Sequence, residues 1–261
     1  MIAIYDSGIG GASVLNAVRA LAPTADIIYL ADQARCPYGD RSAAELQQIA
    51  LGCAAWLIRH GAAPVVVACN SASAVALADM RIAHPTVPFV GMVPAVKPAV
   101  QQTRHGVVGV MATAATLQGR LFHEVKTQYA AGITVVGQAC HGLVEFVEAG
   151  DVSSPALHAA VSAHLAPLHA AGADVIVLGC THYPFLQPVI QHLAPTVQII
   201  DPAPAVARHT LNIIATHGFP LHEQGRIWYY TTGSADHLTW QITALGLPPG
   251  TVAHVAAEEL I

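Results

Sequence analysis

Two cysteines stand at equivalent places in a repeated stretch of the sequence. Gly61-Ala-Ala-Pro-Val-Val-Val-Ala-Cys69 aligns without a gap with Gly172-Ala-Asp-Val-Ile-Val-Leu-Gly-Cys180. Each stretch predicts a buried strand, and each is followed by small polar residues suited to the start of a helix. Because open α/β sheets bind ligands at the carboxyl ends of their strands, the repeat predicts one thiol on each side of a single bound molecule.

A pair of thiols that face one small molecule can invert a stereocentre without a cofactor. A thiolate is a competent base and a thiol is a competent acid, and the reference Cys pKa of about 8.5 makes both forms reachable near neutrality. The dipole at a helix N-terminus is expected to shift such a thiol further toward thiolate. One cysteine can then remove a proton from carbon while the other returns a proton to the opposite face.

Polar residues close to the two cysteines are expected to tune them and to bind substrate. Asp6 ends the first apolar stretch, where it can assist Cys69, and His182 lies two positions after Cys180, where it can assist that thiol. Small polar side chains at the predicted strand ends supply donors for carboxylates: Ser7, Asn70, Ser71, Thr113, Thr116 and Thr181.

Three other interpretations of these residues stay open. A cysteine that ends a buried strand usually packs in the core, although two cysteines at equivalent places favour chemistry. Cys180 and His182 with a further ligand would form a metal site, but Cys-x-His lacks the paired ligand spacing of structural zinc sites. A nucleophilic Cys–His hydrolase is the third possibility, and it leaves Cys69 without a role. The other cysteines are interpreted as structural: Cys36, Cys53 and Cys140.

The elements that must position these residues alternate as strand and helix along the whole chain. Strands are predicted in two series, at 2–5, 26–32, 61–69 and 87–94, and then at 106–112, 133–140, 172–180 and 197–201. Two parallel series predict an α/β protein of two similar lobes, each a mostly parallel sheet flanked by helices, with the active site in the cleft between them. A further strand is predicted at 226–233, and the repeat alone does not assign it to a lobe.

Composition argues against several other classes of protein. The 261 residues can form one large or two smaller domains. There is no run of about 18 apolar residues and no basic region of a secretory signal at the N-terminus, so neither a membrane span nor secretion is expected. The net charge of −5 and the lack of a basic stripe argue against nucleic acid as the main ligand. Five cysteines without a Cys-x-x-Cys pair suit free thiols in a reducing cytoplasm.

Four motifs together resemble the aspartate/glutamate racemase superfamily, most closely its glutamate racemase members. They are Asp6-Ser-Gly-Ile-Gly-Gly11, Arg35-Cys-Pro-Tyr-Gly39, Ala68-Cys-Asn-Ser-Ala72 and Gly179-Cys-Thr-His-Tyr-Pro184. The resemblance implies interconversion of L- and D-glutamate with no metal or other cofactor, a supply of D-glutamate for peptidoglycan, and a cytoplasmic homodimer. It also implies a first lobe of residues 1–96 and 207–261 and a second lobe of residues 97–206.

Carried over by position, the resemblance also implies roles for individual residues. Cys69 would be the base that attacks D-glutamate and Cys180 the base for L-glutamate. Asp6 would assist Cys69, whereas His182 and Glu148 would assist Cys180. Substrate contacts are expected at Asp6, Ser7, Tyr38, Gly39, Asn70, Ser71, Thr116, Thr181 and His182.

Two alternative functions are weighed against glutamate racemisation. The first is an aspartate or broad-specificity amino-acid racemase, but aspartate racemases typically carry Glu at the position of His182. The second, from another class, is a non-catalytic partner that regulates a DNA-processing enzyme. Relatives with that role are said to use an N-terminal extension, whereas this sequence opens on its first predicted strand. Ser71, where the family commonly has Thr, and Cys36, where it usually has no Cys, are the departures from the pattern.

Overall fold

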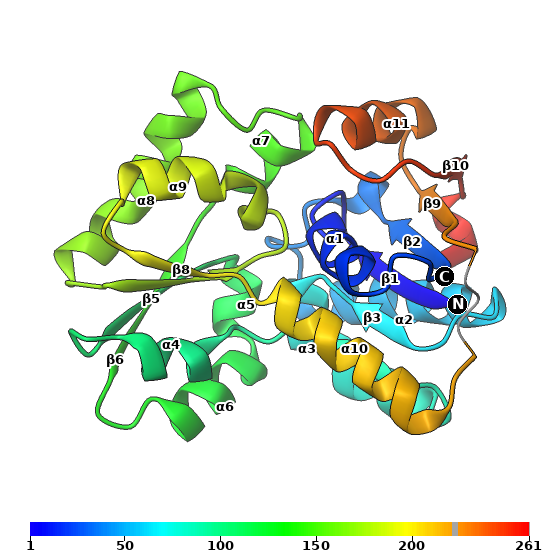
Figure 1. Ribbon diagram of the computed structural model, residues 1–261, viewed down its shortest axis with the longest axis horizontal. Coiled ribbons are helices and arrows are strands. Elements are labelled where there is room, and N and C mark those ends of the chain that lie inside the picture. The colour runs from blue at the N-terminus through cyan, green and yellow to red at the C-terminus, as the bar shows by residue number, and fades with distance from the viewer. Residues whose placement is uncertain (221–223, 261) are drawn as a thin grey trace.

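The computed structural model describes residues 1–220 and 224–260, which form two parallel β-sheets with helices on both faces (Figure 1). The first sheet has the strand order β10-β9-β2-β1-β3-β4, and the second has the order β6-β5-β7-β8. Every strand pairing is parallel, which confirms the predicted α/β class. The strands of the first sheet are β1 (Ile2–Asp6), β2 (Ile27–Ala31), β3 (Val65–Val67), β4 (Phe89–Gly91), β9 (Ile227–Thr231) and β10 (Thr251–His254). Those of the second are β5 (Val107–Ala112), β6 (Thr134–Ala139), β7 (Val175–Gly179) and β8 (Gln198–Ile200).

The repeat seen in the sequence is a repeat of topology. Four neighbouring strands of the first sheet have the order β2-β1-β3-β4. This matches the order β6-β5-β7-β8 of the second sheet when β1–β4 are paired with β5–β8 in chain order. Cys69 follows β3 and Cys180 follows β7, so each thiol stands at the carboxyl end of a corresponding strand. The two cysteines therefore occupy matching positions in two sheets built to the same plan.

Helices cover both faces of each sheet, so the strands are buried on both sides (Figure 1). In the second sheet, Ile176 and Leu178 pack in one apolar core, whereas Val175 and Val177 pack in a separate core on the opposite face. This alternation follows from the two-residue period of a strand. The α-helices are α1 (Ala12–Leu21), α2 (Ala43–Arg59), α3 (Asn70–Ala83), α4 (Val96–Gln102), α5 (Ala114–Gln118), α6 (Arg120–Tyr129), α7 (Leu143–Glu148), α8 (Pro155–Ala170), α9 (Gln187–Leu193), α10 (Ala203–His217) and α11 (Ala235–Ala244).

The helix predicted after Cys69 is present, whereas the chain after Cys180 does not begin an α-helix directly. Cys69 is itself the N-cap residue of α3, which begins at Asn70. After Cys180 the chain forms a 3₁₀ helix, η2 (Tyr183–Leu186), and the α-helix α9 begins only at Gln187. Pro184 lacks the N–H that an α-helix begun at the cysteine would need, so the tighter 3₁₀ turn forms there.

The last strands of the chain return to the first sheet. Helix α10 leads back from β8, and β9 then pairs with β2, Ile27 lying opposite Ile227 (Figure 1). The division of the chain into residues 1–96 with 207–261 and residues 97–206 stays a prediction. Both of its boundaries fall within helices that link the two sheets, α4 and α10.

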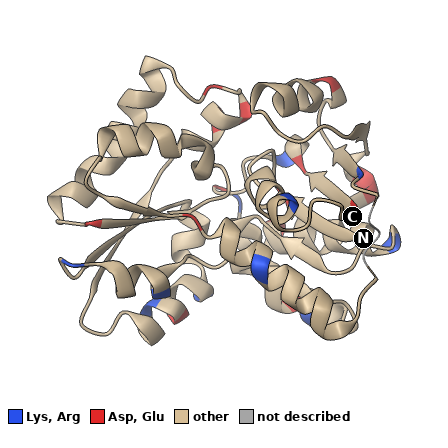
Figure 2. Ribbon diagram, in the orientation of Figure 1, with Lys and Arg blue, Asp and Glu red and all other residues tan. Residues whose placement is uncertain are grey.

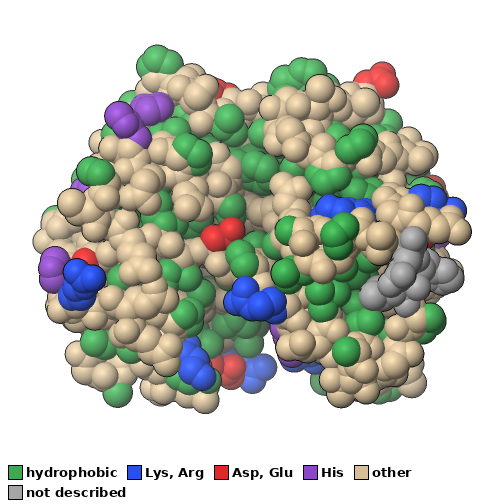
Figure 3. Space-filling model, in the orientation of Figure 1, with side chains coloured by type: hydrophobic (Ala, Val, Ile, Leu, Met, Phe, Trp, Pro, Cys, Tyr) green, Lys and Arg blue, Asp and Glu red, His purple; other side chains and the backbone are tan. Residues whose placement is uncertain are grey.

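The surface carries few charges, and they are spread out. Lys and Arg lie on several helices and loops of both halves of the molecule (Figure 2). A furrow separates the two halves at the top and bottom of the face drawn in Figure 3. Of the helices in the described part of the chain, none is long and apolar enough to cross a membrane.

Asp26 forms hydrogen bonds with Arg226, the residue directly before β9, and so holds β9 against the first sheet. Its carboxylate is buried and accepts hydrogen bonds from the backbone N–H of Arg226 at 2.9 Å and from Nη2 of the same residue at 2.9 Å. Burial by itself would raise the pKa of Asp26, but the bonds from Arg226 hold that pKa below its usual value. A carboxyl of this kind stabilises the fold above its unfolded pKa of about 3.9, and the contribution is lost as the pH falls through the lower folded pKa.

Replacing this carboxylate should loosen the attachment of β9. We expect Asp26→Ala to lower the free energy of unfolding by about 1–3 kcal/mol, because it removes hydrogen bonds to a charged acceptor and leaves a backbone N–H without its partner. Urea denaturation followed by circular dichroism measures the change. Asp26→Asn is the matched control, since its amide oxygen still accepts from Arg226 N–H and the loss should be smaller. Equal stability of Asp26→Ala and wild type would contradict this account.

Candidate active site

The two repeated cysteines line one small cavity between the sheets. Its walls come from the strand ends and loops of both halves of the molecule, with Cys69 contributed by the first sheet and Cys180 by the second. The lining residues are Ser7, Pro37, Tyr38, Gly39, Cys69, Asn70, Ser71, Thr113, Val144, Cys180, Thr181 and His182. The structure thus brings together most of the residues that the sequence nominated for substrate contact.

Cys69 is held at the start of α3. Its sulfur accepts a hydrogen bond from the N–H of Ala72 at 3.5 Å, and its thiol donates to Oγ of Ser7 at 3.8 Å. Burial, together with the nearby charge of Asp6, raises the pKa of Cys69 to about 12. The expectation that the helix N-terminus shifts this thiol toward thiolate is therefore wrong for the structure as it stands. One N–H bond does not offset the loss of water around the sulfur.

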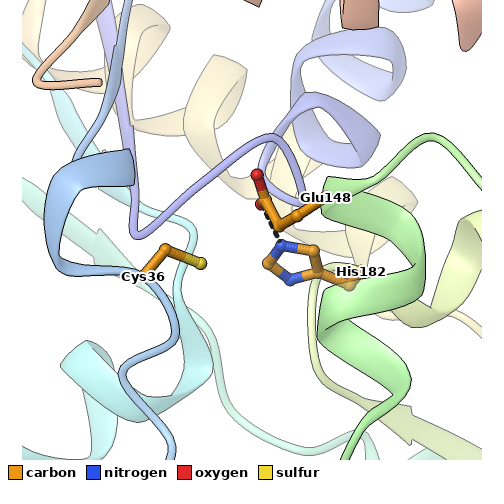
Figure 4. A group of neighbouring side chains, drawn as sticks. All are labelled: Cys36, Glu148 and His182. Atoms are coloured by element: carbon orange, nitrogen blue, oxygen red, sulfur yellow. Dashed lines mark hydrogen bonds and ion pairs between the residues drawn. The ribbon is translucent and has the colours of Figure 1, made fainter. Parts of the chain in front are cut away.

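Cys180 faces a buried ion pair. Nδ1 of His182 lies 3.7 Å from Sγ of Cys180. On the same ring, Nε2 lies 2.6 Å from Oε1 of Glu148 (Figure 4). Burial lowers the pKa of His182, but hydrogen bonds with Cys180, Cys36 and Glu148 outweigh it and raise that pKa well above its usual value. Burial likewise acts to raise the pKa of Glu148, yet the bonds from His182 and others bring it to about 2. Both pKa shifts favour the imidazolium and carboxylate forms of the pair at neutral pH.

Glu148 is fixed by donors from the other half of the molecule. Although it ends α7 beside the second sheet, its Oε1 accepts from the N–H of Ile9 at 2.7 Å and its Oε2 from Nε2 of Gln33 at 2.9 Å. Gln241 of α11 donates from Nε2 both to the backbone oxygen of Glu148, at 2.7 Å, and to Oε2, at 3.2 Å. The carboxylate that faces His182 is thus held by hydrogen bonds from the other half of the molecule.

Asp6 likewise forms hydrogen bonds with residues of both halves of the molecule. It is fully buried and accepts hydrogen bonds from the N–H of Gly8 and from Oγ1 of Thr181, each at 3.0 Å. Burial raises its pKa to about 6, so this carboxyl can gain or lose a proton near neutrality. Asp6 and Glu148 are not among the residues that line the cavity, and they contact the lining residues Thr181 and His182.

Asn70 and Thr113 supply polar groups on the wall. Both polar atoms of the Asn70 side chain are buried, and among the described residues they have no hydrogen-bond partner. A buried amide without partners is costly unless a ligand satisfies it, which favours Asn70 as a binding group. Thr113 Oγ1 lies 2.9 Å from Oγ of Ser71 and donates to Oγ1 of Thr116 at 2.9 Å. Thr116, nominated for substrate contact, therefore supports Thr113, which lines the cavity.

A family model described as Asp/Glu/Hydantoin racemase matches residues 12–210 of the chain. The chain belongs to this racemase family. The glutamate racemase of Roseiflexus sp. (strain RS-1) is 52% identical over 251 residues, which are 95% of this chain and 92% of the relative. These findings confirm the resemblance carried by the four motifs, and they make the protein a member of a family of isomerases.

Solved structures of glutamate racemases share the fold of this racemase. The enzyme from Francisella tularensis subsp. tularensis SCHU S4, in complex with D-glutamate, has a TM-score of 0.87 and 25% identity, and the match covers 98% of this chain and 97% of that one. The Escherichia coli enzyme, in complex with L-glutamate and the activator UDP-MurNAc-ala, has a TM-score of 0.86, 30% identity and 98% coverage of both chains. The two-sheet architecture is therefore that of glutamate racemases.

Several residues of the racemase site were missed by sequence reasoning. Gln33 and Gln241 hold Glu148 but stand 208 positions apart in the chain, so no local pattern connects them. Pro37 and Val144 line the cavity as apolar wall residues; Pro37 lies within the Arg35–Gly39 motif but was not nominated, and Val144 belongs to no motif. Thr113, by contrast, was nominated from the sequence, because the internal repeat placed it at the strand end that corresponds to Ser7.

Removing the charge of Glu148 should release the proton held on His182. We expect Glu148→Gln to lower the pKa of His182, because the amide cannot stabilise the imidazolium as a carboxylate does. Titration of the imidazole by heteronuclear NMR measures the shift, with His182→Asn used to assign the signal among the 15 histidines. Glu145→Gln, a change at an exposed residue of the same helix, is the matched control and should leave the titration as in wild type. An unchanged His182 pKa in Glu148→Gln would show that the ion pair does not set it.

Proposed function

We propose that this chain is a glutamate racemase that interconverts L- and D-glutamate, with Cys69 and Cys180 as the two acid–base groups. The observation that carries the proposal is that these two thiols, from corresponding strands of two sheets, line the same cavity. A relative 52% identical over 95% of the chain is named a glutamate racemase, and the two solved relatives hold D-glutamate and L-glutamate.

The reaction needs one proton removed and one returned. Starting from D-glutamate, the thiolate of Cys69 takes the α-proton, and the electron pair left on carbon is delocalised into the α-carboxylate. The thiol of Cys180 then donates its proton to the opposite face, which yields L-glutamate and leaves Cys180 as thiolate. L-glutamate reacts by the reverse sequence, so no cofactor takes part in the scheme.

The groups behind the thiols supply what this scheme requires. Burial raises the pKa of Cys69 to about 12, so the cationic ammonium of the substrate is needed to favour the thiolate. Asp6, with its pKa raised to about 6, is suited to exchange a proton at the Cys69 end of the cavity. His182, 3.7 Å from Sγ of Cys180, is the proton partner on the other side, and Glu148 orients it.

Substrate binding is assigned in the proposal to the polar wall of the cavity. The unpartnered amide of Asn70 and the hydroxyls of Ser7, Ser71 and Thr181 offer donors to the carboxylates of glutamate. Tyr38 and Gly39 are further lining residues of the cavity, and Thr116 acts through Thr113. The role that the resemblance implies is the supply of D-glutamate for peptidoglycan synthesis, and hence for cell shape, by a cytoplasmic homodimer.

Substrate preference separates the proposal from its alternative, an aspartate or broad-specificity racemase. We expect L-glutamate to lose its circular dichroism signal on incubation with the protein, faster than L-aspartate at equal concentration. The physical reason is that, in a site that binds glutamate, the buried polar groups that meet its longer side chain are left unpaired by the shorter diacid. Faster loss with L-aspartate would overturn the glutamate assignment while leaving the two-thiol chemistry in place.

The two-thiol scheme predicts that neither cysteine can replace the other. We expect Cys69→Ser and Cys180→Ser each to reduce racemisation by about 10²-fold or more, because general acid–base catalysis typically contributes about 10²–10⁴-fold. Racemisation is followed by circular dichroism, and incorporation of deuterium at the α-carbon in D₂O by mass spectrometry. Cys140→Ser, at a strand end outside this cavity, is the control and should stay active. Near wild-type racemisation by either catalytic variant would refute the scheme.

A further inference from the structure

Three potential metal ligands meet beside the cavity. Cys36 follows the short 3₁₀ helix η1 (Gln33–Arg35), Glu148 ends α7 and His182 precedes η2, and their ligand atoms all lie within 4.8 Å of one another. Figure 4 shows the sulfur of Cys36 pointing toward the imidazole of His182, whose Nε2 faces Glu148. The cluster joins elements from both halves of the molecule.

The donor set selects a particular class of cation. One thiolate, one imidazole and one carboxylate, with a fourth position open, match the ligands and coordination number that Zn²⁺ takes in proteins. Sulfur and nitrogen donors disfavour Mg²⁺ and Ca²⁺, which bind through oxygen. The carboxylate is also oriented from outside the cluster, by Gln33 and Gln241, as metal ligands usually are.

Cys36 is the member that the proposed reaction does not use. Its side chain is half-buried and is not among the residues that line the cavity. Without its sulfur the cluster is only a His–Glu ion pair, which offers too few ligands to hold a zinc ion firmly. Cys36 therefore decides whether the cluster can bind a metal.

We propose that Cys36, Glu148 and His182 form an inhibitory site for a thiophilic divalent cation such as Zn²⁺ or Cd²⁺. The cation takes the place of the proton between Nε2 of His182 and Oε1 of Glu148. These atoms are 2.6 Å apart, and the ligand atoms of a tetrahedral zinc site are about 3.3 Å apart, so the side chains must separate by under about 1 Å. Binding releases two protons, one from the Cys36 thiol and one from the imidazolium, and leaves a neutral complex.

Inhibition follows from the proposed function, on which this part of the inference rests. A His182 ring bound to a cation through Nε2 is fixed in place and no longer shares a proton with Glu148. It cannot then serve as the proton partner of Cys180, and racemisation stops. The metal is an inhibitor in this account and has no part in the reaction itself.

Metal binding is measured with the full chain, by a titration that does not depend on enzyme activity. Titration with Co²⁺ should give the near-ultraviolet charge-transfer band of a cobalt–thiolate bond in wild type. The band should be lost in Cys36→Ala and kept in Cys140→Ser, the matched control. A band of equal strength in Cys36→Ala, or no band in wild type, would overturn the site.

Inhibition is then measured with Zn²⁺ in a buffer free of chelators. We expect Cys36→Ala to stay active and to need at least about tenfold more Zn²⁺ for half-inhibition than wild type, with chelator restoring wild-type activity. Equal sensitivity of the two proteins would assign inhibition to the catalytic thiols and overturn the proposal. A cobalt band that depends on Cys36 in a protein without racemase activity would support the site and remove the proposed function.

Discussion

The buried ion pair between His182 and Glu148 is the constraint around which the site is arranged. A carboxylate and an imidazolium out of water are tolerable only if nearly every donor and acceptor is paired, and here Ile9, Gln33 and Gln241 complete the carboxylate. The pair also requires glycine at two nearby positions, because a side chain there would overlap it. A Cβ on Gly8 would lie 1.9 Å from Oε1 of Glu148, and one on Gly10 would lie 2.4 Å from Nδ1 of His182.

The two sheets repeat one plan, but the surroundings of their cysteines differ. Cys69 caps a helix beside a carboxyl whose pKa is raised, whereas Cys180 precedes a 3₁₀ turn and faces an imidazolium. A duplicated scaffold supplies two sulfurs to one cavity, and in the proposed reaction the unlike neighbours give each sulfur its own proton partner. Inversion of a stereocentre needs that combination, since the two faces of the carbon are met by an acid and a base at once.

Hydrogen bonds across the cavity hold the two halves together at the site. Asp6 binds Thr181, Ser71 binds Thr113, and Glu148 binds residues of the other half. Asp6, Thr181 and His182 are buried at these contacts, and electrostatic interactions are stronger away from water. The same hydrogen bonds therefore bury the groups whose pKa values are shifted and hold the candidate catalytic groups in position. It also brings the sulfur of Cys36 to the ion pair, which is why the site is open to thiophilic metals.

The sequence by itself determined the α/β class, the two series of strands and the pair of cysteines at their ends. These features depend on local apolar runs and on an internal repeat, which are legible without knowing distant contacts. Tertiary structure alone decided that Gln33 and Gln241 hold Glu148, that Thr113 lines the cavity in front of Thr116, and that Cys36 meets His182. It also reversed the expected direction of the Cys69 pKa. The physical reason is the same in each case: burial and contact between residues far apart in the chain depend on how the two sheets pack, and no local pattern records that packing.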